Sequence, residues 1–366
     1  MGKLSEETSR KPRFEGNIFY LSYLGEEYSR SGVHLTFLKQ SYQNLSVEFI
    51  KLKVPLVLNI CLIYRLSQKN KSNNCVFVVM SPSNILVVLL KIFSRKKIVL
   101  DAGWPISDST ELRASNAWSR VKSLILDFVS FKLSDLVLLE SEEQFLHCKS
   151  KFRIDSKKYA VLHTGFNEIA FEKSKAEDQI IELDVKKALN FVPGSILVFF
   201  RGLDNVEAGI DNLLAAARET PNINFCIVSG NCSRLDLPKN VLLLDRWVNA
   251  SELMALYNRA DIVMGQLGEA NRINRTIAHK IFEGAYFEKP IISSESDSLK
   301  RLFTNESSIL FFNKSKGESL SELIVRLSTS RELRERLSTN IKEIYSKKLS
   351  QERISRRFLD ILDSRF

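Results

Sequence analysis

Residues 256–294, LYNRADIVMGQLGEANRINRTIAHKIFEGAYFEKPIISS, decide the fold of this chain. Their apolar runs predict a buried strand at 262–265 and a second one at 290–293. Between the two strands we expect a loop over 266–273 and a helix over about 274–287. Strand, helix and strand in this order are typical of a parallel α/β sheet, which binds ligands where its strands end and its helices begin.

The predicted helix carries a cation and a carboxylate on one face. Lys280 and Glu283 are three residues apart, so their side chains project from nearly the same side. A lysine can neutralise phosphate charge, and a carboxylate can accept two hydroxyl hydrogen bonds at once. The pair therefore suits a nucleotide, although an ordinary ion pair on a surface helix would show the same spacing.

The motif K-x-x-E-G-A at 280–285, followed by K-P-I-I, resembles the nucleotide-sugar loop of family-4 glycosyltransferases, which are retaining enzymes. The resemblance implies the GT-B fold: an α/β protein with two Rossmann-like domains facing each other across a cleft. It also implies that Glu283 and the adjoining Gly284 hold the ribose of a nucleotide-sugar, and that Lys280 meets its diphosphate. The start of the helix near 274–277 would add backbone N–H groups to the diphosphate site.

Two departures from the family pattern change the expected donor site. Many members carry G-R-x-x-x-x-K-G after the first strand of the second domain, and both cations touch the pyrophosphate. This chain reads GLDNVEAG at 202–209, so Leu203 and Ala208 replace the two cations. We expect Arg201 and the Gly202 loop to hold the diphosphate instead. Arg275 stands where the family has a carboxylate that meets the sugar, and it is either a phosphate ligand or a solvated loop residue.

The first half of the chain supplies candidates for the acceptor side. Its alternating strands and helices predict another doubly wound sheet, and the DAGWP segment at 101–105 resembles a first-domain loop of polysaccharide-building members. Asp101, at the end of a predicted strand, is a candidate catalytic or acceptor-binding group, or else a loop-capping aspartate. His34, beside Gly32 in a predicted loop, is the second catalytic candidate.

The order of the predicted elements divides the chain into four parts. Residues 1–171 form an N-terminal, acceptor-side Rossmann-like domain, and the polar segment 172–193 connects it to the next domain. Residues 194–349 form a C-terminal Rossmann-like domain that binds the nucleotide-sugar. Residues 350–366 form a final helix that we expect to return to the N-terminal domain.

The positive charge of the chain is concentrated near its beginning. The formal net charge is +10, and residues 1–100 carry a net +9. Between Glu48 and Asp101 there are nine basic residues and no acidic one, and several of the basic residues border the apolar runs 54–66 and 84–93. This pattern favours association with an anionic membrane surface, although a solvated basic face would give the same counts. No nucleic-acid-binding motif accompanies the charge.

Several classes of protein find no support in the sequence. Neither apolar run reaches the roughly 18 residues needed to span a bilayer, and the polar start of the chain is not a secretory signal. The five scattered cysteines predict reduced thiols in the cytoplasm. The four histidines lack metal-ligand spacing, so we expect no metal, and no cofactor besides the nucleotide-sugar as co-substrate. P-loop, dinucleotide-binding and serine-hydrolase motifs do not occur.

These patterns together predict a retaining, metal-independent, hexosyltransferase-like glycosyltransferase, cytoplasmic and peripheral on the membrane. Its acceptor would be a lipid-linked or cell-surface glycan precursor. Two alternatives stay open: a nucleotide-sugar 2-epimerase of the same fold, and a catalytically degenerate homologue that binds a partner.

Overall fold

A computed structural model describes most of the chain. The described residues are 14, 16–26, 29–42, 45–53, 59–69, 75–112, 116–174, 195–230, 232, 236–315 and 317–366. They form two compact units, of which the first comprises Met1–Glu140, Phe145–His163 and Gln351–Phe366. The second unit comprises Ser141–Gln144 and Thr164–Ser350. The expected connector, 172–193, lies mostly outside the described residues.

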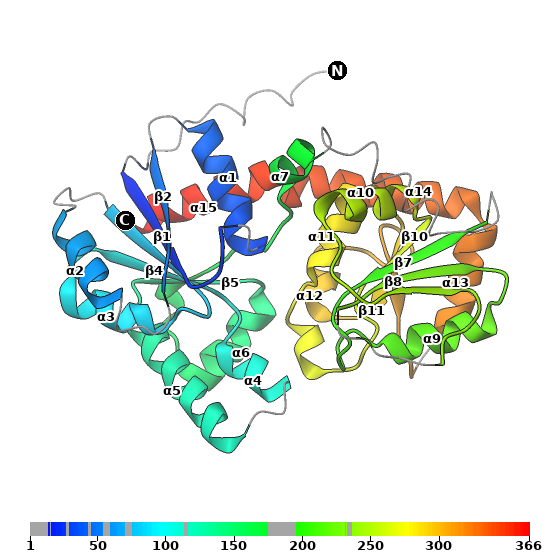
Figure 1. Ribbon diagram of the computed structural model, residues 1–366, viewed down its shortest axis with the longest axis horizontal. Helices are drawn as coiled ribbons and strands as arrows, with labels where there is room; N and C mark the ends of the chain where they lie inside the picture. The colour runs from blue at the N-terminus through cyan, green and yellow to red at the C-terminus, as the bar shows by residue number, and fades with distance from the viewer. Residues whose placement is uncertain are drawn as a thin grey trace. The chain divides into compact units, whose positions relative to one another are not determined.

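The first unit is built on a six-stranded parallel sheet, in which the strand order is β2-β1-β3-β4-β5-β6 (Figure 1). All residues of β3 and β5 are buried, as expected for parallel strands that helices cover on both faces. The strands are β1 (Asn17–Ser22), β2 (Ser46–Lys51), β3 (Cys75–Met80), β4 (Lys97–Gly103), β5 (Leu136–Leu139) and β6 (Tyr159–Val161).

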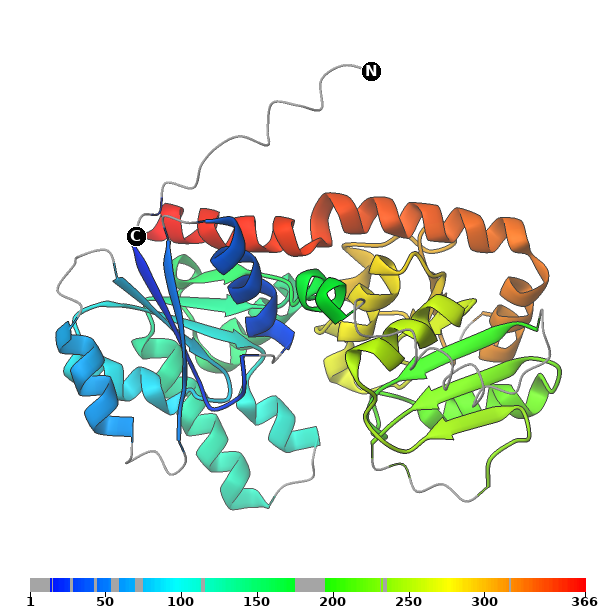
Figure 2. The same ribbon diagram turned by 45° about the horizontal axis from the view of Figure 1, so that its top comes forward.

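Helices cover both faces of this first sheet. One face packs against α2 (Ile60–Lys69), α3 (Ile85–Phe93), α5 (Ala117–Leu133) and α6 (Glu142–Phe152). The other face packs against α1 (Ser29–Ser41) and α15 (Gln351–Arg365). The short α4 (Ile106–Leu112) lies against α5. Figure 2 shows α15 running beside α1, so the end of the chain completes the core of the first unit.

The second unit repeats this architecture with the strand order β12-β11-β10-β7-β8-β9, again all parallel. The strands expected at 262–265 and 290–293 are confirmed to within one residue. The strands are β7 (Leu197–Arg201), β8 (Asn224–Val228), β9 (Val241–Leu244), β10 (Ile262–Met264), β11 (Ile291–Ser294) and β12 (Leu310–Phe312).

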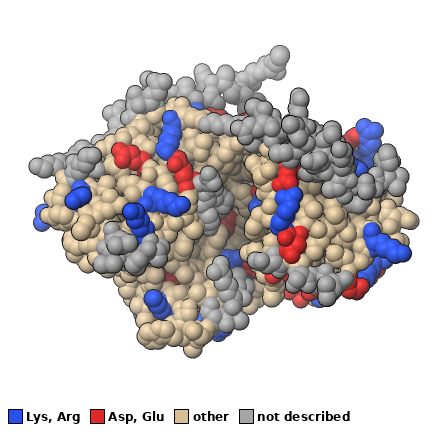
Figure 3. Space-filling view, viewed as in Figure 1, with Lys and Arg blue, Asp and Glu red and all other residues tan. Residues whose placement is uncertain are grey.

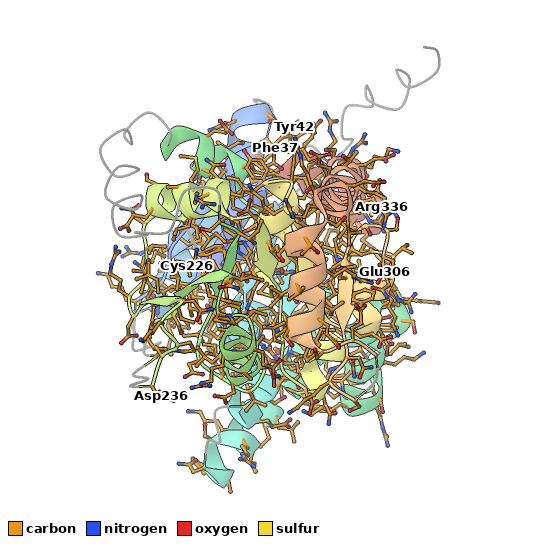
Figure 4. The ribbon with its side chains drawn as sticks, turned by 90° about the vertical axis from the view of Figure 1, so that its right-hand side faces the viewer. Phe37, Tyr42, Cys226, Asp236, Glu306 and Arg336 are labelled. Atoms are coloured by element: carbon orange, nitrogen blue, oxygen red, sulfur yellow. The ribbon has the colours of Figure 1, made fainter. Side chains whose placement is uncertain are left out.

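Two apolar layers hold the helices of the second unit to its sheet. One face packs against α7 (Glu168–Ser174), α10 (Ala250–Arg259), α11 (His279–Tyr286), α12 (Asp297–Lys300) and α14 (Arg331–Ile344). The other face packs against α9 (Ile210–Glu219) and α13 (Leu320–Thr329). Cys226 lies inside β8 and is fully buried (Figure 4), and burial raises the pKa of its thiol to about 12.

The helix after β10 is shorter than the sequence predicts. It begins at His279, with Ala278 as its N-cap, whereas we expected a helix from about residue 274. A 3₁₀ turn at Asn271–Asn274 occupies the start of the predicted range instead. The free N–H groups of the helix therefore belong to the turn that holds Lys280, and not to residues 274–277.

The C-terminal helices serve both units. Arg336 on α14 donates a hydrogen bond to the carbonyl oxygen of Glu306 at 3.4 Å, within the second unit (Figure 4). A π turn at Tyr345–Leu349 leads from α14 to α15. In the first unit, the Gln351 side chain donates to the Val33 carbonyl at 2.9 Å, so the last helix is hydrogen-bonded to α1.

Candidate functional site

Five side chains of the second unit gather where β7 ends and α11 begins. Arg201 is the last residue of β7, and Lys280 and Glu283 lie in the first and second turns of α11. His279 is the first residue of that helix, and Tyr257 comes from α10. Because β7 pairs with β10, the loop that follows β10 brings α11 to the end of β7.

Glu283 is the centre of this cluster, and its side chain is 1% exposed. Arg201 Nη1 donates to Oε1 of the carboxylate, and His279 Nδ1 lies 2.8 Å from the same oxygen. The Tyr257 hydroxyl donates to Oε2 at 2.5 Å. Burial raises the pKa of Glu283, but Arg201 and His279 lower it further, to about 2. The carboxylate is therefore ionised at every physiological pH.

The cluster reaches solvent through two of its members. The side chains of Arg201 and His279 are 25% and 27% exposed. An incoming hydroxyl group would therefore meet a carboxylate that already has three donors. Ligand hydroxyls would compete with these protein donors for the carboxylate, and the expected role of Glu283 as an acceptor for ribose stays a prediction.

Lys280 is a buried cation beside this cluster. Its Nζ lies 3.8 Å from the centroid of the Phe200 ring, within cation–π range. Burial and the charge of Arg201 lower the pKa of Lys280 to about 7, although Glu283 opposes the shift. A Cβ at Gly202 would lie 3.1 Å from that Nζ, so the glycine leaves room for the ammonium. Near neutral pH the lysine is poised to take up a proton when an anion arrives.

Glycines allow the loop 202–209 to pack directly on the loop after β10. Gly209 has φ +65°, and a Cβ there would lie 2.4 Å from the carbonyl carbon of Leu267. A Cβ at Gly268 would lie 1.8 Å from the carbonyl oxygen of residue 206. A bidentate ion pair also joins the two loops, because Arg272 donates to both carboxylate oxygens of Glu207, at 2.7 and 2.6 Å. These glycines therefore let the two loops pack directly on each other.

Two more residues, Gly284 and Arg275, were predicted to bind the nucleotide-sugar. A Cβ at Gly284 would lie 2.9 Å from Ile291 Cδ1 and 3.2 Å from Val263 Cγ1. The bare face of this glycine therefore lets α11 pack on the sheet, and its expected part in ligand binding stays a prediction. Arg275 follows the 3₁₀ turn and lies outside α11, and its expected role as a phosphate ligand stays a prediction.

Tyr257 and His279 contact Glu283, but the sequence alone did not indicate them as site residues. His279 precedes Glu283 by four residues, the spacing at which helical side chains meet, so a local signal for it existed. Tyr257 is 26 residues away on another helix. Only the packing of α10 against α11 brings its hydroxyl to the carboxylate, and no local pattern reports that packing.

A cavity of about 580 Å³ opens in the first unit, where β3 and β4 end. Asp101, Arg30 and Trp104 are among the residues that line it. Arg30 Nε donates to Asp101 Oδ1 at 2.5 Å. Asp101 Oδ2 is buried and has no hydrogen-bond partner among the described residues. Burial raises the pKa of Asp101, although Arg30 opposes the shift. The cavity is thus lined by a carboxylate whose second oxygen is enclosed by the protein and has no hydrogen-bond partner among the described residues.

The structure does not support His34 as a catalytic residue. It lies in α1, where we expected a loop, and its side chain is fully buried. The imidazole stacks on Phe358 of α15, with ring centroids 5.3 Å apart. Burial and the nearby Arg30 lower the pKa of His34 to about 3, so the ring is neutral. It belongs to the core between α1 and α15, and it does not line the Asp101 cavity.

Neither a metal cluster nor a membrane span is found among the described residues. No group of three or more His, Cys, Asp or Glu side chains is arranged there to hold a metal ion. No helix in the same residues is both long and apolar enough to cross a bilayer. Whether turnover needs a metal stays a prediction.

Part of the chain matches a protein-family model. Residues 193–361 match the family model described as glycosyl transferase-like. Among curated proteins, no sequence matches the chain. The matched range contains the whole Arg201–Glu283 cluster.

Solved structures match nearly the whole chain. A glycosyltransferase from Rickettsia africae is 15% identical, with a TM-score of 0.68, and the match covers 96% of this chain and 98% of that one. HepE from Anabaena, in complex with UDP-glucose, is 14% identical with a TM-score of 0.64, covering 95% and 99%. The UDP-GlcNAc 2-epimerase from Neisseria meningitidis, bound to UDP-GlcNAc, is 12% identical with a TM-score of 0.59, covering 94% and 98%.

At these identities the structural matches show the fold alone. They confirm the expected fold class: two α/β units with parallel sheets, in the arrangement of elements called GT-B. The membership in family 4 that the motifs suggest stays a prediction. What is established is a GT-B protein whose residues 193–361 are glycosyl transferase-like.

Proposed function

We propose that this protein is a hexosyltransferase-like glycosyltransferase that moves a sugar from a nucleotide-sugar to an acceptor hydroxyl, with retention and without a metal. The Arg201–Glu283–Lys280 cluster at the start of α11 carries the proposal. It joins two cations, a buried carboxylate and a helix N-terminus within the range that is glycosyl transferase-like. The neighbour solved with UDP-glucose supports a nucleotide-sugar as donor.

The cluster is suited to hold a diphosphate. Lys280 lies in the first turn of α11, where the helix dipole favours an anion. The negative charge of a bound diphosphate would raise the pKa of Lys280 again, so that the lysine binds a proton and becomes a cation. Arg201 is already oriented by Glu283, so little reorganisation is needed when charge develops on the leaving group.

The reaction then needs few protein groups. The bond from the anomeric carbon to the diphosphate oxygen breaks, and the acceptor oxygen forms the new bond on the same face of the sugar. The acceptor proton goes to the departing phosphate oxygen, which is the route that the family resemblance implies. Lys280, Arg201 and the N-terminus of α11 would stabilise the charge left on the nucleoside diphosphate.

The cavity of the first unit is the proposed acceptor site. Asp101 and Trp104 line it, and Trp104 offers an aromatic wall to a sugar ring. We propose that the acceptor is a lipid-linked or cell-surface glycan precursor, which the protein meets as a cytoplasmic, peripheral enzyme at an anionic membrane. The basic first hundred residues support that location.

Two rival functions share this evidence. A nucleotide-sugar 2-epimerase is one of the solved neighbours, and it would need no acceptor. A degenerate, partner-binding homologue is favoured by Leu203, Ala208 and Arg275, which replace charged residues of the family pattern. The pairing of Arg201 with Glu283 favours a working site, since it supplies a cation that the motif lacks.

Nucleotide binding by Lys280→Met tests the donor site. We expect titration calorimetry with UDP, GDP, dTDP, ADP and CMP to find one nucleotide that binds the wild type. Methionine keeps the apolar contact with Phe200 but removes the charge, so affinity should fall by about tenfold or more. Wild-type affinity should also weaken as pH rises through about 7, because the lysine then stays neutral.

Lys289→Met is the matched control. It makes the same change of charge just beyond the other end of α11, where Lys289 donates to the Asn258 carbonyl at 3.0 Å. Its nucleotide affinity should equal that of the wild type. No binding of any nucleotide would favour the degenerate homologue. Release of an epimerised sugar without an acceptor would favour the epimerase, and loss of turnover in EDTA would contradict the metal-free mechanism.

A further inference from the structure

Helix α5 of the first unit buries polar side chains and exposes apolar ones, the reverse of a usual surface helix. Its buried positions include three polar residues, Ser123, Asp127 and Ser130. Its outer face is apolar, with side chains between 40% and 76% exposed: Trp118, Val121, Leu124, Ile125 and Phe128. A helix on the surface of a soluble unit normally shows the reverse arrangement.

The polar side chains of α5 are hydrogen-bonded within the first unit. Asp127 accepts from the backbone N–H groups of Ile106 and Ser107 at 3.1 and 2.8 Å, and from the Asn84 side chain at 3.1 Å. Ser123 shares a hydrogen bond of 2.9 Å with Thr110. These contacts fix α5 to α3 and α4 through its polar side. Its outward apolar side chains are therefore not needed to hold the fold.

The outer side chains form one continuous stripe. Positions 118, 121, 125 and 128 follow the three- and four-residue spacing of a single helix face, so the stripe is about 15 Å long. Trp118 at its N-terminal end is 76% exposed, more than any other large hydrophobic side chain of the described residues. An apolar patch of several side chains with an aromatic end marks an interaction surface.

The charge around the stripe indicates what covers it. Three exposed cations, Arg120, Lys122 and Lys132, belong to α5, whose one acidic residue is the buried Asp127. Over α5, at the lowest part of the first unit, Figure 3 shows a surface that is mainly neither acidic nor basic, with isolated Lys and Arg. Apolar and aromatic side chains bordered by cations fit the headgroup region of an anionic bilayer. A second copy of this face would instead oppose like charges.

We infer that α5 is the surface by which the protein enters the interface of an anionic membrane. The stripe lies in the acyl boundary, and Arg120 and Lys122 contact lipid phosphates. This inference rests on the proposed membrane association and makes it local, since the sequence pointed only to basic residues between 51 and 97. It does not involve the donor cluster of the second unit, so nucleotide binding and vesicle binding can fail separately.

Vesicle flotation of the full chain tests the inference. We expect wild type to float with vesicles of phosphatidylcholine and phosphatidylglycerol, and poorly with phosphatidylcholine alone. The double variant Trp118→Gln, Phe128→Gln should lose at least about tenfold in its partition coefficient, because two large apolar anchors are removed. Trp247→Gln combined with Val325→Gln is the matched control, since both residues are exposed but lie in the second unit. It should float like the wild type.

Tryptophan fluorescence gives a second readout. The chain has three tryptophans, so Trp104→Phe with Trp247→Phe leaves Trp118 as the reporter. Its emission should shift to shorter wavelength when anionic vesicles are added, and nucleotide binding by Trp118→Gln, Phe128→Gln shows whether that variant is folded. Unchanged flotation of that variant, or no flotation of the wild type, would overturn the inference. So would a concentration-dependent dimer that the α5 substitutions dissolve, because the stripe would then bind a second copy.

Discussion

An arginine–carboxylate pair lies at the carboxyl end of each sheet, Arg30–Asp101 in the first unit and Arg201–Glu283 in the second, and the two pairs are built differently. In the second unit, Arg201 shares Glu283 with two further donors, and both carboxylate oxygens are engaged. In the first unit, Arg30 reaches only Oδ1 of Asp101, and Oδ2 has no partner among the described residues. The same chemical pair is complete in one unit and open in the other.

The pKa values express this difference. Burial raises the pKa of both carboxylates, but the donors around Glu283 reverse the effect and bring it to about 2. Arg30 alone does not reverse it, so the pKa of Asp101 stays raised. A fully satisfied carboxylate fixes its neighbours in place, whereas an incompletely satisfied one has capacity left for a ligand. The carboxylate of Glu283 is thus fully satisfied within the protein, and that of Asp101 is not.

The largest expected effect is on stability at pH 7. A pKa of about 2, against an ordinary value of 4.5, corresponds to about 3 kcal/mol of stability from the Glu283 charge. Glu283→Gln should therefore lower the free energy of unfolding by about that amount. Asp101→Asn should lower it by less, because burial disfavours the charge of Asp101 and raises its pKa. Urea unfolding measures both, and equal losses would contradict the comparison.

The pH dependence of stability should have opposite signs in the two units. The contribution of Glu283 is fully present above pH 4.5 and is lost as pH falls from there towards 2. Asp101 binds a proton more readily in the folded state, so its unit gains stability as pH falls through the raised pKa towards 3.8. The difference between wild type and Glu283→Gln should shrink in acid by about 3 kcal/mol, while that for Asp101→Asn should move in favour of the wild type. Urea titrations repeated across this pH range would show it.

The smallest expected effect concerns two buried tyrosines. Tyr257→Phe removes a donor from the ionised Glu283 and should lower the free energy of unfolding by about 2 kcal/mol. Tyr20→Phe is the matched change in the first unit, where the buried hydroxyl has no hydrogen-bond partner among the described residues. It should be neutral or slightly stabilising. If Tyr20→Phe lowered the free energy of unfolding as much as Tyr257→Phe, the Tyr20 hydroxyl would have a stabilising partner. The contrast between the two units would then be wrong.

The sequence predicts more of the fold than of the site. Apolar runs such as 75–80 and 136–139 read directly as strands because both their faces are buried. The α11 motif brought Lys280 and Glu283 to the right place, since their spacing is local to one helix. His34 was misjudged because its surroundings come from Phe358 at the far end of the chain.

The two faces of α5 show the same limit. The helix is predicted at 119–133, close to the observed Ala117–Leu133. Its polar side faces inward because Asn84 and the N–H groups of Ile106 and Ser107 donate hydrogen bonds to Asp127 there. A periodic pattern defines two faces of a helix, but long-range partners decide which of them is buried.

The return of α15 to the first unit also sets a timetable for synthesis. The core between β1, α1 and the last helix contains Phe358 and Leu362, which leave the ribosome about 190 residues after the rest of that unit ends at His163. At common translation rates, this delay is on the order of 10–40 s. During that time the nascent first unit shows an uncovered apolar face beside α1, and this core closes only when α15 has been synthesised.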